Sequence, residues 1–200
     1  MILYGASGHA KVVIEILENS GITIDGFFDD NPEITSLCGY KCSLFNSHKI
    51  VNNQLIISIG DNRIRKSIVD KIGKVVYGKA IDVKSSVSKR SIIEEGSVIM
   101  PGTTINSGAI IGKHSIINTN ASVDHDCMVG NYVHVSPGSS IAGNVTIGEG
   151  THIGTGASII PNITIGKWCT IGAGSVIITD ISDFAVVVGN PGKIIKHNSI

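Results

Sequence analysis

Net charge is the first property that the sequence lacks. Its 200 residues hold 16 Lys and Arg against 16 Asp and Glu, and the basic residues form no run. Nucleic acids and acidic membranes are bound by a concentrated basic face. The sequence therefore predicts neither of them as a partner.

Long apolar runs are missing as well. A helix needs about 20 apolar residues to cross a bilayer. No such run occurs, so no membrane span is expected. The opening segment MILYGASGHA has no charged region followed by an apolar run, so it is not expected to act as a signal peptide. A cytoplasmic protein fits these absences best.

Cysteine is scarce, and the four residues present form no zinc-binding pattern. Cys38 and Cys42 could pair, but free thiols are expected in a protein that is not secreted. Cys127 and Cys169 fall on inward positions of the repeat described next, so they are expected to be core thiols.

A strict six-residue repeat dominates the rest of the chain. A fixed period decides the fold before any local pattern is considered. Six matches neither a helix nor a simple strand, and it predicts a β-helix whose short strands form the three flat faces of a triangular coil. Every sixth residue is Ile or Val at seventeen consecutive positions: Ile81, Val87, Ile93, Ile99, Ile105, Ile111, Ile117, Val123, Val129, Val135, Ile141, Ile147, Ile153, Ile159, Ile165, Ile171 and Ile177.

The other repeat positions agree with this fold. The residue four places after each aliphatic is usually small or β-branched, and Gly often follows the aliphatic directly. We expect an aliphatic interior capped by small side chains, with Gly giving the corners their backbone freedom. Residues eighteen apart should stack at about 4.8 Å per coil. No hexad is interrupted, so no long loop should leave the solenoid.

The first eighty residues follow another pattern, in which strands and helices alternate. Helices are expected after Gly5–His9 and around Ile64–Ile72, and the alternation predicts a Rossmann-like α/β domain with a parallel sheet. We place the domains at 1–78 and 79–200. The expected strands are Ile2–Tyr4, Ile22–Phe28, Gln54–Ile59 and Val75–Tyr77.

Three segments should meet at the carboxyl edge of this sheet. Gly5–His9 lies where a strand turns into a helix, and helix-start amides favour phosphate groups. Asp29–Asp30 ends the next strand and could hold ribose hydroxyls or a base edge. Gly60–Asn62 ends the third strand. GxGxxG is absent, so a bound nucleotide portion is favoured over a dinucleotide, and a tight turn that merely requires Gly remains the alternative.

Seven His are the next candidates for chemistry. His48 and His197 lie in polar segments and should be solvated. His114 has an outward coil position and no acidic neighbour. His134 and His152 share a column, but that column contains no third ligand, so no metal is expected.

His125 differs because a carboxylate lies on each side of it, at Asp124 and Asp126. A general base needs a ring nitrogen near neutral pKa and a partner that fixes its tautomer. Gly143 lies one coil further along, where the missing side chain leaves room for a reacting group and the amide could face an oxyanion. The alternative is that His125 only decorates a turn.

Five segments together resemble a known family: GASGHAKVV, the DD pair, IGDNRIR, VDHDC and VVVGNPGK. They are similar to the bacterial sugar acyltransferases. This family includes the sialic acid O-acetyltransferases of the NeuD type and the N-acetyltransferases of nucleotide-linked 4-amino sugars in bacillosamine synthesis. The resemblance implies a left-handed β-helix, an exception to the right-handed crossover rule. It also implies a homotrimer that binds acetyl-CoA between neighbouring solenoids.

The resemblance also implies roles for single residues. His125 matches the general base, and Asp126 matches the acidic residue that raises its basicity. The acetyl-CoA contacts correspond to His134, Thr155 and Ala173. The residues that match contacts to the nucleotide sugar or lie near the acceptor are Ser7, Gly8, His9, Asp29, Asp30, Gly60 and Asn118.

The expected activity is acetyl-CoA-dependent N-acetylation of a nucleotide-linked amino sugar of the UDP-4-amino-sugar type, in surface glycan biosynthesis. His125 would deprotonate the amine that attacks the thioester, and the Gly143 amide would meet the oxyanion. Cys127 points inward and is a poor nucleophile. A sialic acid O-acetyltransferase and a non-enzymatic scaffold remain the alternatives.

Overall fold

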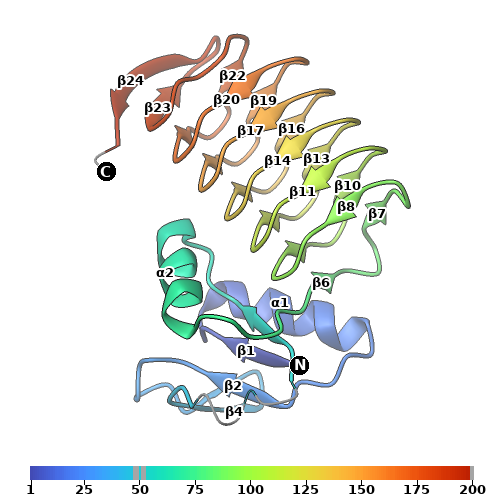
Figure 1. The fold of residues 1–200 in the computed structure, drawn as a ribbon, viewed down its shortest axis with the longest axis vertical. Coiled ribbons are helices and arrows are strands. Elements are labelled where there is room, and N and C mark those ends of the chain that lie inside the picture. The colour runs from blue at the N-terminus through green and yellow to red at the C-terminus, as the bar shows by residue number, and fades with distance from the viewer. Residues whose placement is uncertain (47–49, 51–52, 199–200) are drawn as a thin grey trace.

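The computed structural model describes residues 1–46, 50 and 53–198, and its N-terminal part is a small parallel sheet with two helices (Figure 1). The sheet has the strand order β3-β4-β2-β1-β5, in which only the β3–β4 pair is antiparallel. Its elements are β1 (Ile2–Tyr4), α1 (Gly8–Asn19), β2 (Gly26–Phe28), β3 (Ser36–Leu37), β4 (Tyr40–Ser43), β5 (Leu55–Ile57) and α2 (Asn62–Ile72).

The predicted alternation of strands and helices is confirmed, with local differences. The second strand is shorter than expected, because only Gly26–Phe28 pairs with β1. The expected strand Val75–Tyr77 is reduced to a single bridge between Tyr77 and Leu55. The hairpin of β3 and β4 was not predicted. Neither described helix is long and apolar enough to cross a membrane.

The two helices differ in how their first turns are capped. In α2 the Asp61 side chain caps the first turn by accepting a hydrogen bond from the Ile64 N–H at 2.8 Å. In α1 the first residue after the N-cap Ser7 is Gly8, and the Ser7 hydroxyl makes no capping hydrogen bond. The apolar face of α1 is buried on the sheet at Val13, Ile14 and Leu17.

The remainder is a solenoid of the left-handed β-helix type, built from two-residue strands on three faces. Face A contains β6 (Ala80–Ile81), β9 (Val98–Ile99), β12 (Ile116–Ile117), β15 (His134–Val135), β18 (His152–Ile153), β21 (Thr170–Ile171), β23 (Ala185–Val188) and β24 (Lys193–His197). Face B contains β7 (Ser86–Val87), β10 (Thr104–Ile105), β13 (Ser122–Val123), β16 (Ser140–Ile141), β19 (Ser158–Ile159) and β22 (Val176–Ile177). Face C contains β8 (Ile92–Ile93), β11 (Ile110–Ile111), β14 (Met128–Val129), β17 (Thr146–Ile147) and β20 (Thr164–Ile165).

The predicted stacking period is confirmed by the strand register. Val123, for example, pairs with Ile105 on one side and Ile141 on the other, each eighteen residues away. The aliphatic column forms one buried core along the whole solenoid. Small inward side chains complete it and satisfy the corner carbonyls: the Ser115 hydroxyl donates to Gly130 O and the Ser139 hydroxyl to Gly154 O, at 2.8 and 2.9 Å.

The two solenoid cysteines take the same inward position, as predicted. Cys127 and Cys169 are buried, and Cys127 Sγ donates to Ala142 O at 3.1 Å. Cys38 and Cys42 are free thiols.

The reason expected for the glycines that follow the aliphatics is wrong. Gly112, Gly130 and Gly148 have no left-handed backbone, so conformational freedom is not what they supply. A Cβ at Gly148 would instead lie 2.6 Å from the backbone of Gly166 and Lys167 in the next coil. The glycines are required because adjacent coils approach closely there.

The left-handed position occurs elsewhere in the corners, at every sixth residue from Gly96 to Gly174, and residues other than Gly often occupy it. Asp126 has φ +58° at the corner between faces B and C. His114, Tyr132 and Trp168 have φ between +53° and +58° at the corner between faces C and A. Bulky residues such as Tyr132 and Trp168 are uncommon in this conformation, whereas His is more often found in it.

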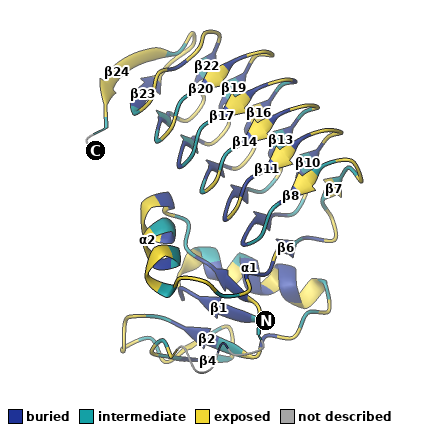
Figure 2. Cartoon of the chain, in the orientation of Figure 1, coloured by how far each residue is buried: buried dark blue, intermediate teal, exposed yellow. Residues whose placement is uncertain are grey.

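The N-terminal layer packs on the outer side of face A. Ala80, Val98 and Ile116 form one column along that face and share a hydrophobic cluster with α1. The next two positions of the column are His134 and His152. Ala80, Val98 and Ile116 are all buried, and Figure 2 shows β6 in the colour of buried residues. The outer side of the solenoid is therefore apolar under α1 and polar further along.

We expect Ile147→Ala to lower the free energy of unfolding by about 2–5 kcal/mol, because the side chain is 1% exposed and its loss leaves a cavity in the stack. Thr146→Ala is the matched control: it changes the preceding, exposed residue and should shift stability by less than about 0.5 kcal/mol. Urea unfolding followed by circular dichroism measures both. Equal losses in the two variants would contradict the assigned stacking.

Candidate active site

The corner that follows β13 brings His125 and two carboxylates together. The Asp124 carboxylate accepts from the His125 N–H at 2.7 Å and from Asn106 Nδ2 at 2.7 Å. Asp126 has a left-handed backbone, which Asp tolerates better than most residues. This conformation brings Asp126 Oδ2 to 2.9 Å from His125 Nδ1. The predicted acid–histidine pair is therefore present, and the partner is Asp126.

These carboxylates raise the pKa of His125 above its ordinary value. The hydrogen bond to Asp126 is the largest cause, and the charge of Asp124 adds to it. Because a carboxylate only accepts hydrogen bonds, Nδ1 carries the proton and Nε2 is left as the basic nitrogen. His125 is exposed, so a reacting group can reach it from outside the chain.

Gly143 lies beside this ring, as the eighteen-residue register predicted. A Cβ at Gly143 would stand 2.6 Å from His125 Nε2. The space left by the missing side chain is thus filled by the imidazole itself, and the expectation that it would hold a reacting group is wrong. Among the described residues the Gly143 N–H has no partner within the chain.

At the N-terminal sheet edge, Asp29 and Asp30 are already engaged. Asp29 accepts from the Ala6 N–H at 2.6 Å and from the Asn31 N–H at 2.8 Å. Asp30 accepts from Tyr4 Oη at 2.5 Å and pairs with Lys71 at 3.2 Å. Asp29 therefore shapes the loop before α1, in addition to any contact it makes with a ligand.

The two glycines of that loop have different requirements. Gly5 has φ +106°, and a Cβ there would lie 2.3 Å from Ile59 Cγ1. The tight-turn interpretation is correct for Gly5. Gly8 has neither constraint, and a Cβ there would meet nothing within 4 Å. Gly8 and the uncapped Ser7 are both exposed at the start of α1.

A row of imidazoles connects this edge to face A. The His9 and His134 ring centroids are 6.3 Å apart, and those of His134 and His152 are 5.0 Å apart. His134 Nδ1 lies 3.1 Å from Gly60 O, and His134 Nε2 lies 2.9 Å from Asn118 Nδ2. Four of the predicted site residues, His9, Gly60, Asn118 and His134, are thus brought together from two parts of the chain.

These imidazoles are kept neutral by their surroundings. Burial lowers the pKa of His134 to about 3 and that of His9 to about 4, and the nearby charge of Arg65 acts in the same direction. The Nε2 atom of His9 is buried without a hydrogen-bond partner. Among the described residues no group of His, Cys, Asp and Glu could hold a metal ion.

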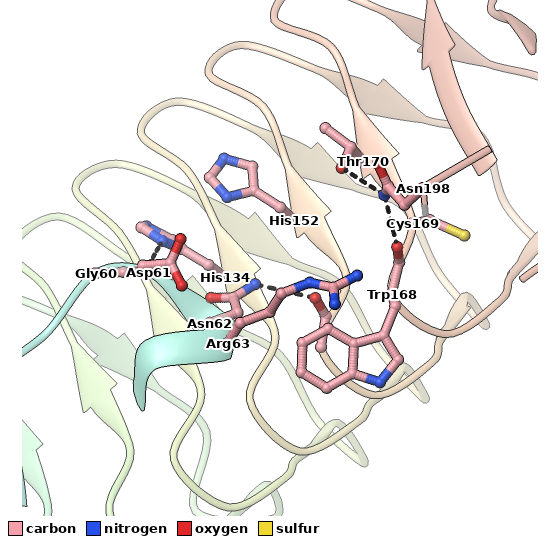
Figure 3. A pocket seen from close by; sticks show the side chains of 11 residues that line it. Gly60, Asp61, Asn62, Arg63, His134, His152, Trp168, Cys169, Thr170 and Asn198 are labelled. Carbon is pink, nitrogen blue, oxygen red and sulfur yellow. Dashed lines mark hydrogen bonds between the residues drawn. The ribbon is translucent and has the colours of Figure 1, made fainter. Parts of the chain in front are cut away.

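A pocket of about 500 Å³ opens beside this row, between the start of α2 and face A (Figure 3). His134 and His152 form one side of it, and the Arg63 guanidinium lies 5.3 Å from the Trp168 ring centroid on the other. Asn198 lies at the far end of the pocket, where its Nδ2 donates to Trp168 O at 3.0 Å and to Thr170 Oγ1 at 3.2 Å.

His114 departs from its predicted environment. It is 3% exposed, stacks on Tyr132 at 5.3 Å and receives the edge of Tyr77 at 4.5 Å. Glu95 is also close enough to influence its pKa. The position is outward on the solenoid, as expected, but the N-terminal part of the chain covers it. His197 is exposed, and His48 lies outside the described residues.

Comparison with known proteins gives matches along both parts of the chain. Residues 1–72 match the PglD N-terminal domain, and residues 126–160 and 144–179 match the bacterial transferase hexapeptide repeats. The structure is similar to that of a histidine-to-asparagine mutant of perosamine N-acetyltransferase from Caulobacter crescentus in complex with CoA and GDP-perosamine. The TM-score is 0.91 and the identity 36%, covering 96% of this chain and 95% of that one. The chain belongs to the sugar N-acetyltransferases of the hexapeptide-repeat superfamily.

Three further proteins are similar to this chain. The acetyltransferase domain of PglB from Neisseria gonorrhoeae in complex with acetyl coenzyme A has a TM-score of 0.89 and 35% identity, over 97% of this chain and 98% of that one. WeeI from Acinetobacter baumannii has a TM-score of 0.84 and 29% identity over the same shares. An uncharacterized mimivirus protein is 32% identical over 90 residues; the match covers 44% of this chain and 18% of that protein's length.

Two residues expected to contact acetyl-CoA, Thr155 and Ala173, do not meet His125 within one chain. Thr155 and Ala173 are exposed and stack at the corner between faces A and B, where the Gly174 N–H donates to Thr155 O at 2.9 Å. His125 and Gly143 lie at the corner between faces B and C. Face B separates the two groups.

Sequence reasoning missed the residues that join the two parts of this enzyme. Arg65 and Asn62 of α2 are buried against the solenoid corner, and Arg63 and Trp168 line the pocket. The segment IGDNRIR contains three of them, and its two Arg so close to a sheet edge were the available signal. Arg65 and Asn62 donate to backbone carbonyls of the solenoid, which no sequence pattern indicates.

We expect Gly5→Ala to lower the free energy of unfolding by about 1–3 kcal/mol, because the side chain would clash with Ile59 in a backbone region that Ala disfavours. Gly8→Ala is the control: it should leave thermal stability unchanged or slightly raised. A loss of stability in Gly8→Ala equal to that in Gly5→Ala would contradict the two assignments.

Proposed function

We propose that this chain transfers the acetyl group of acetyl-CoA to the amino group of a nucleotide-linked amino sugar, in surface glycan biosynthesis. The observation that carries the proposal is the His125–Asp126 pair, with its basic Nε2 beside Gly143 at an open corner. Relatives of nearly the same length bind CoA together with GDP-perosamine, or acetyl coenzyme A. Both named relatives are acetyltransferases, and this similarity favours N-acetylation over the sialic acid and scaffold alternatives.

In the proposed mechanism the nitrogen of the sugar amine attacks the thioester carbonyl carbon. His125 Nε2 takes the proton that this amine loses. Asp126 holds the ring tautomer and stabilises the imidazolium that forms. Collapse of the tetrahedral intermediate expels the CoA sulfur, which receives the proton from His125. The products are the amide and free CoA, and no covalent enzyme intermediate is needed.

The developing oxyanion needs a donor that is already in place. Gly143 lies next to His125, and its N–H has no partner in the described chain, which supports the proposed contact. Cys127 is buried in the stack, and burial raises the pKa of its thiol. Both facts argue against a thiolate nucleophile.

We place the nucleotide sugar at the N-terminal sheet edge. Ser7 and Gly8 are exposed at the start of α1, where helix amides favour phosphate. Asp29, Asp30 and Gly60 surround the same edge. Asn118 is held against His134, and its amide is oriented by the Thr119 N–H, which donates to Asn118 Oδ1 at 2.8 Å. In this proposal residues 1–78 bind the nucleotide sugar and 79–200 carry the acyl transfer.

Acetyl-CoA is proposed to lie along the corner of Thr155 and Ala173, toward His134. Because His125 occupies another corner, we propose that the site forms between two copies in a homotrimer. Exposed apolar side chains on face C, a column of Ile92, Ile110 and Met128, support burial against another copy. A cytoplasmic location is consistent with acetyl-CoA as the donor.

His125→Ala is expected to lower kcat by about 10²- to 10⁴-fold, the usual contribution of a positioned general base. The neutral ring is the active form, so the rate should rise with pH through the raised pKa of His125. Asp126→Asn removes the main cause of that raise. Asp126→Asn should lower kcat less than His125→Ala does. It should also move the ascending limb of the profile of rate against pH to lower pH.

Rate against pH, measured with saturating acetyl-CoA and the nucleotide amino sugar, tests this assignment. The limb should vanish in His125→Ala. An unchanged limb and a near-normal kcat in that variant would remove His125 from the mechanism.

A mixing experiment tests whether the site is shared between chains. His125→Ala removes the base, and Ala173→Trp blocks the proposed acetyl-CoA corner, so each variant alone should be inactive. Trimers refolded from an equal mixture should regain about a quarter of wild-type activity, since a site can draw each intact residue from a different chain. A mixture that stays inactive, although both variants co-assemble, would place the site within one chain.

A further inference from the structure

Arg65 is a buried cation at the junction of the two parts of the chain. Its side chain comes from α2 and is 1% exposed. Burial lowers its pKa to about 10, so it remains charged at neutral pH. Within the described residues no salt bridge joins it to a carboxylate. The charge of Asp61 favours the cation without a direct ion pair. A buried charge with no direct ion pair costs free energy unless its donors are satisfied.

All five N–H donors of the guanidinium are satisfied by neutral oxygens. Nε donates to His114 O at 2.7 Å, and Nη2 donates to Tyr132 O at 3.0 Å and Asn62 Oδ1 at 2.8 Å. Nη1 donates to Ile59 O at 2.9 Å and Gly60 O at 3.1 Å. Arg65 thus ties its own helix and the sheet-edge loop to two successive coils of the solenoid.

The left-handed corner makes these solenoid acceptors available. His114 and Tyr132 are eighteen residues apart, both have φ near +55°, and their rings stack almost parallel. A single planar guanidinium reaches both carbonyls because successive coils repeat at the strand spacing. Lys could not replace Arg65, because an ammonium group has only three N–H donors and lacks the planar arrangement of the guanidinium.

The Gly60 carbonyl extends this contact toward the substrate region. It accepts from Arg65 Nη1 and also lies 3.1 Å from His134 Nδ1. A carbonyl only accepts, so Nδ1 of His134 carries the proton and Nε2 is the acceptor. Asn118 Nδ2 then donates to Nε2 at 2.9 Å. One continuous set of hydrogen bonds therefore runs from Arg65 to the amide proposed to face the acceptor.

We infer that Arg65 is a positioning residue: through Gly60 and the tautomer of His134, it sets the orientation of Asn118 relative to the sheet edge that holds the nucleotide sugar. The acceptor role of Asn118 rests on the proposed function, whereas the hydrogen-bond series from Arg65 to Asn118 does not. The charged and titratable groups that act on the pKa of His134 are His152, Arg65 and His9, and each lowers it. The carboxylate of Asp61 lines the same pocket.

The test compares Arg65→Met with Lys66→Met. Lys66 is the adjacent residue of α2, carries the same charge, and pairs at the surface with Asp70. Arg65→Met should raise the KM of the nucleotide amino sugar about tenfold, the equivalent of roughly one lost hydrogen bond. The KM of acetyl-CoA should rise less, because Thr155 and Ala173 lie at another corner. Lys66→Met should leave both values at the wild-type level. GDP-perosamine and a UDP-linked 4-amino sugar are the acceptors to supply.

A second readout separates positioning from simple stabilisation. Nitrogen-15 NMR of labelled histidine rings, with the His134 signal assigned through His134→Gln, reports which ring nitrogen is protonated. Wild type should show the Nδ1–H form of His134 from pH 8 to pH 5, and Arg65→Met should show a mixture of tautomers. If Arg65→Met does not fold, Arg65→Lys, which keeps the charge but loses the fork, takes its place.

The outcomes distinguish this inference from the proposed function. An Nε2–H form of His134 in wild type, or an unchanged tautomer together with an unchanged sugar KM in a folded Arg65 variant, would overturn the inference. A wild-type protein that shows the Nδ1–H form of His134 but acetylates neither nucleotide sugar would support the hydrogen bonds from Arg65 to Asn118. The same result would reject these two nucleotide sugars as acceptors.

Discussion

The whole structure depends on the close approach of successive coils at a spacing of eighteen residues. Aliphatic side chains fill the interior, and inward Ser, Thr and Cys side chains donate to corner carbonyls of the following coil. The approach is so tight that Gly148 cannot carry a Cβ. Because every coil repeats the one before it, a residue's place in the hexad decides whether it faces the core or the surface.

Corner conformation then determines which surface positions carry chemistry. In each corner from Gly96 to Gly174 one residue adopts a left-handed backbone, and Gly occupies that position at many of these corners. Where Asp126 takes that position, its carboxylate reaches the neighbouring imidazole. Where His114 and Tyr132 take it, their rings form the surface on which α2 rests and their carbonyls face outward to Arg65. The same local geometry thus serves a proposed catalytic pair at one corner and a docking surface at another.

The junction also decides the charge state of the histidines. His9, His114, His134 and His152 all have a lowered pKa, with burial as the largest cause and Arg65 as a further one. His125 lies outside this environment, and the neighbouring carboxylates raise its pKa. Burial and charge therefore separate one basic imidazole from a group of neutral ones that can only donate or accept hydrogen bonds.

The sequence by itself determined the solenoid, because a period of six residues can bury its aliphatic column in few ways, and the register placed Gly143 beside His125 in advance. It also indicated the first sheet and the edge at Gly8 and Gly60, since strand ends are marked locally. Only the tertiary structure decided that His114 is buried, that His134 is locked by Gly60, and that Arg65 joins the two parts. These contacts use backbone carbonyls as acceptors. Every residue has such a carbonyl, so no residue type reveals the contact until the chain has folded.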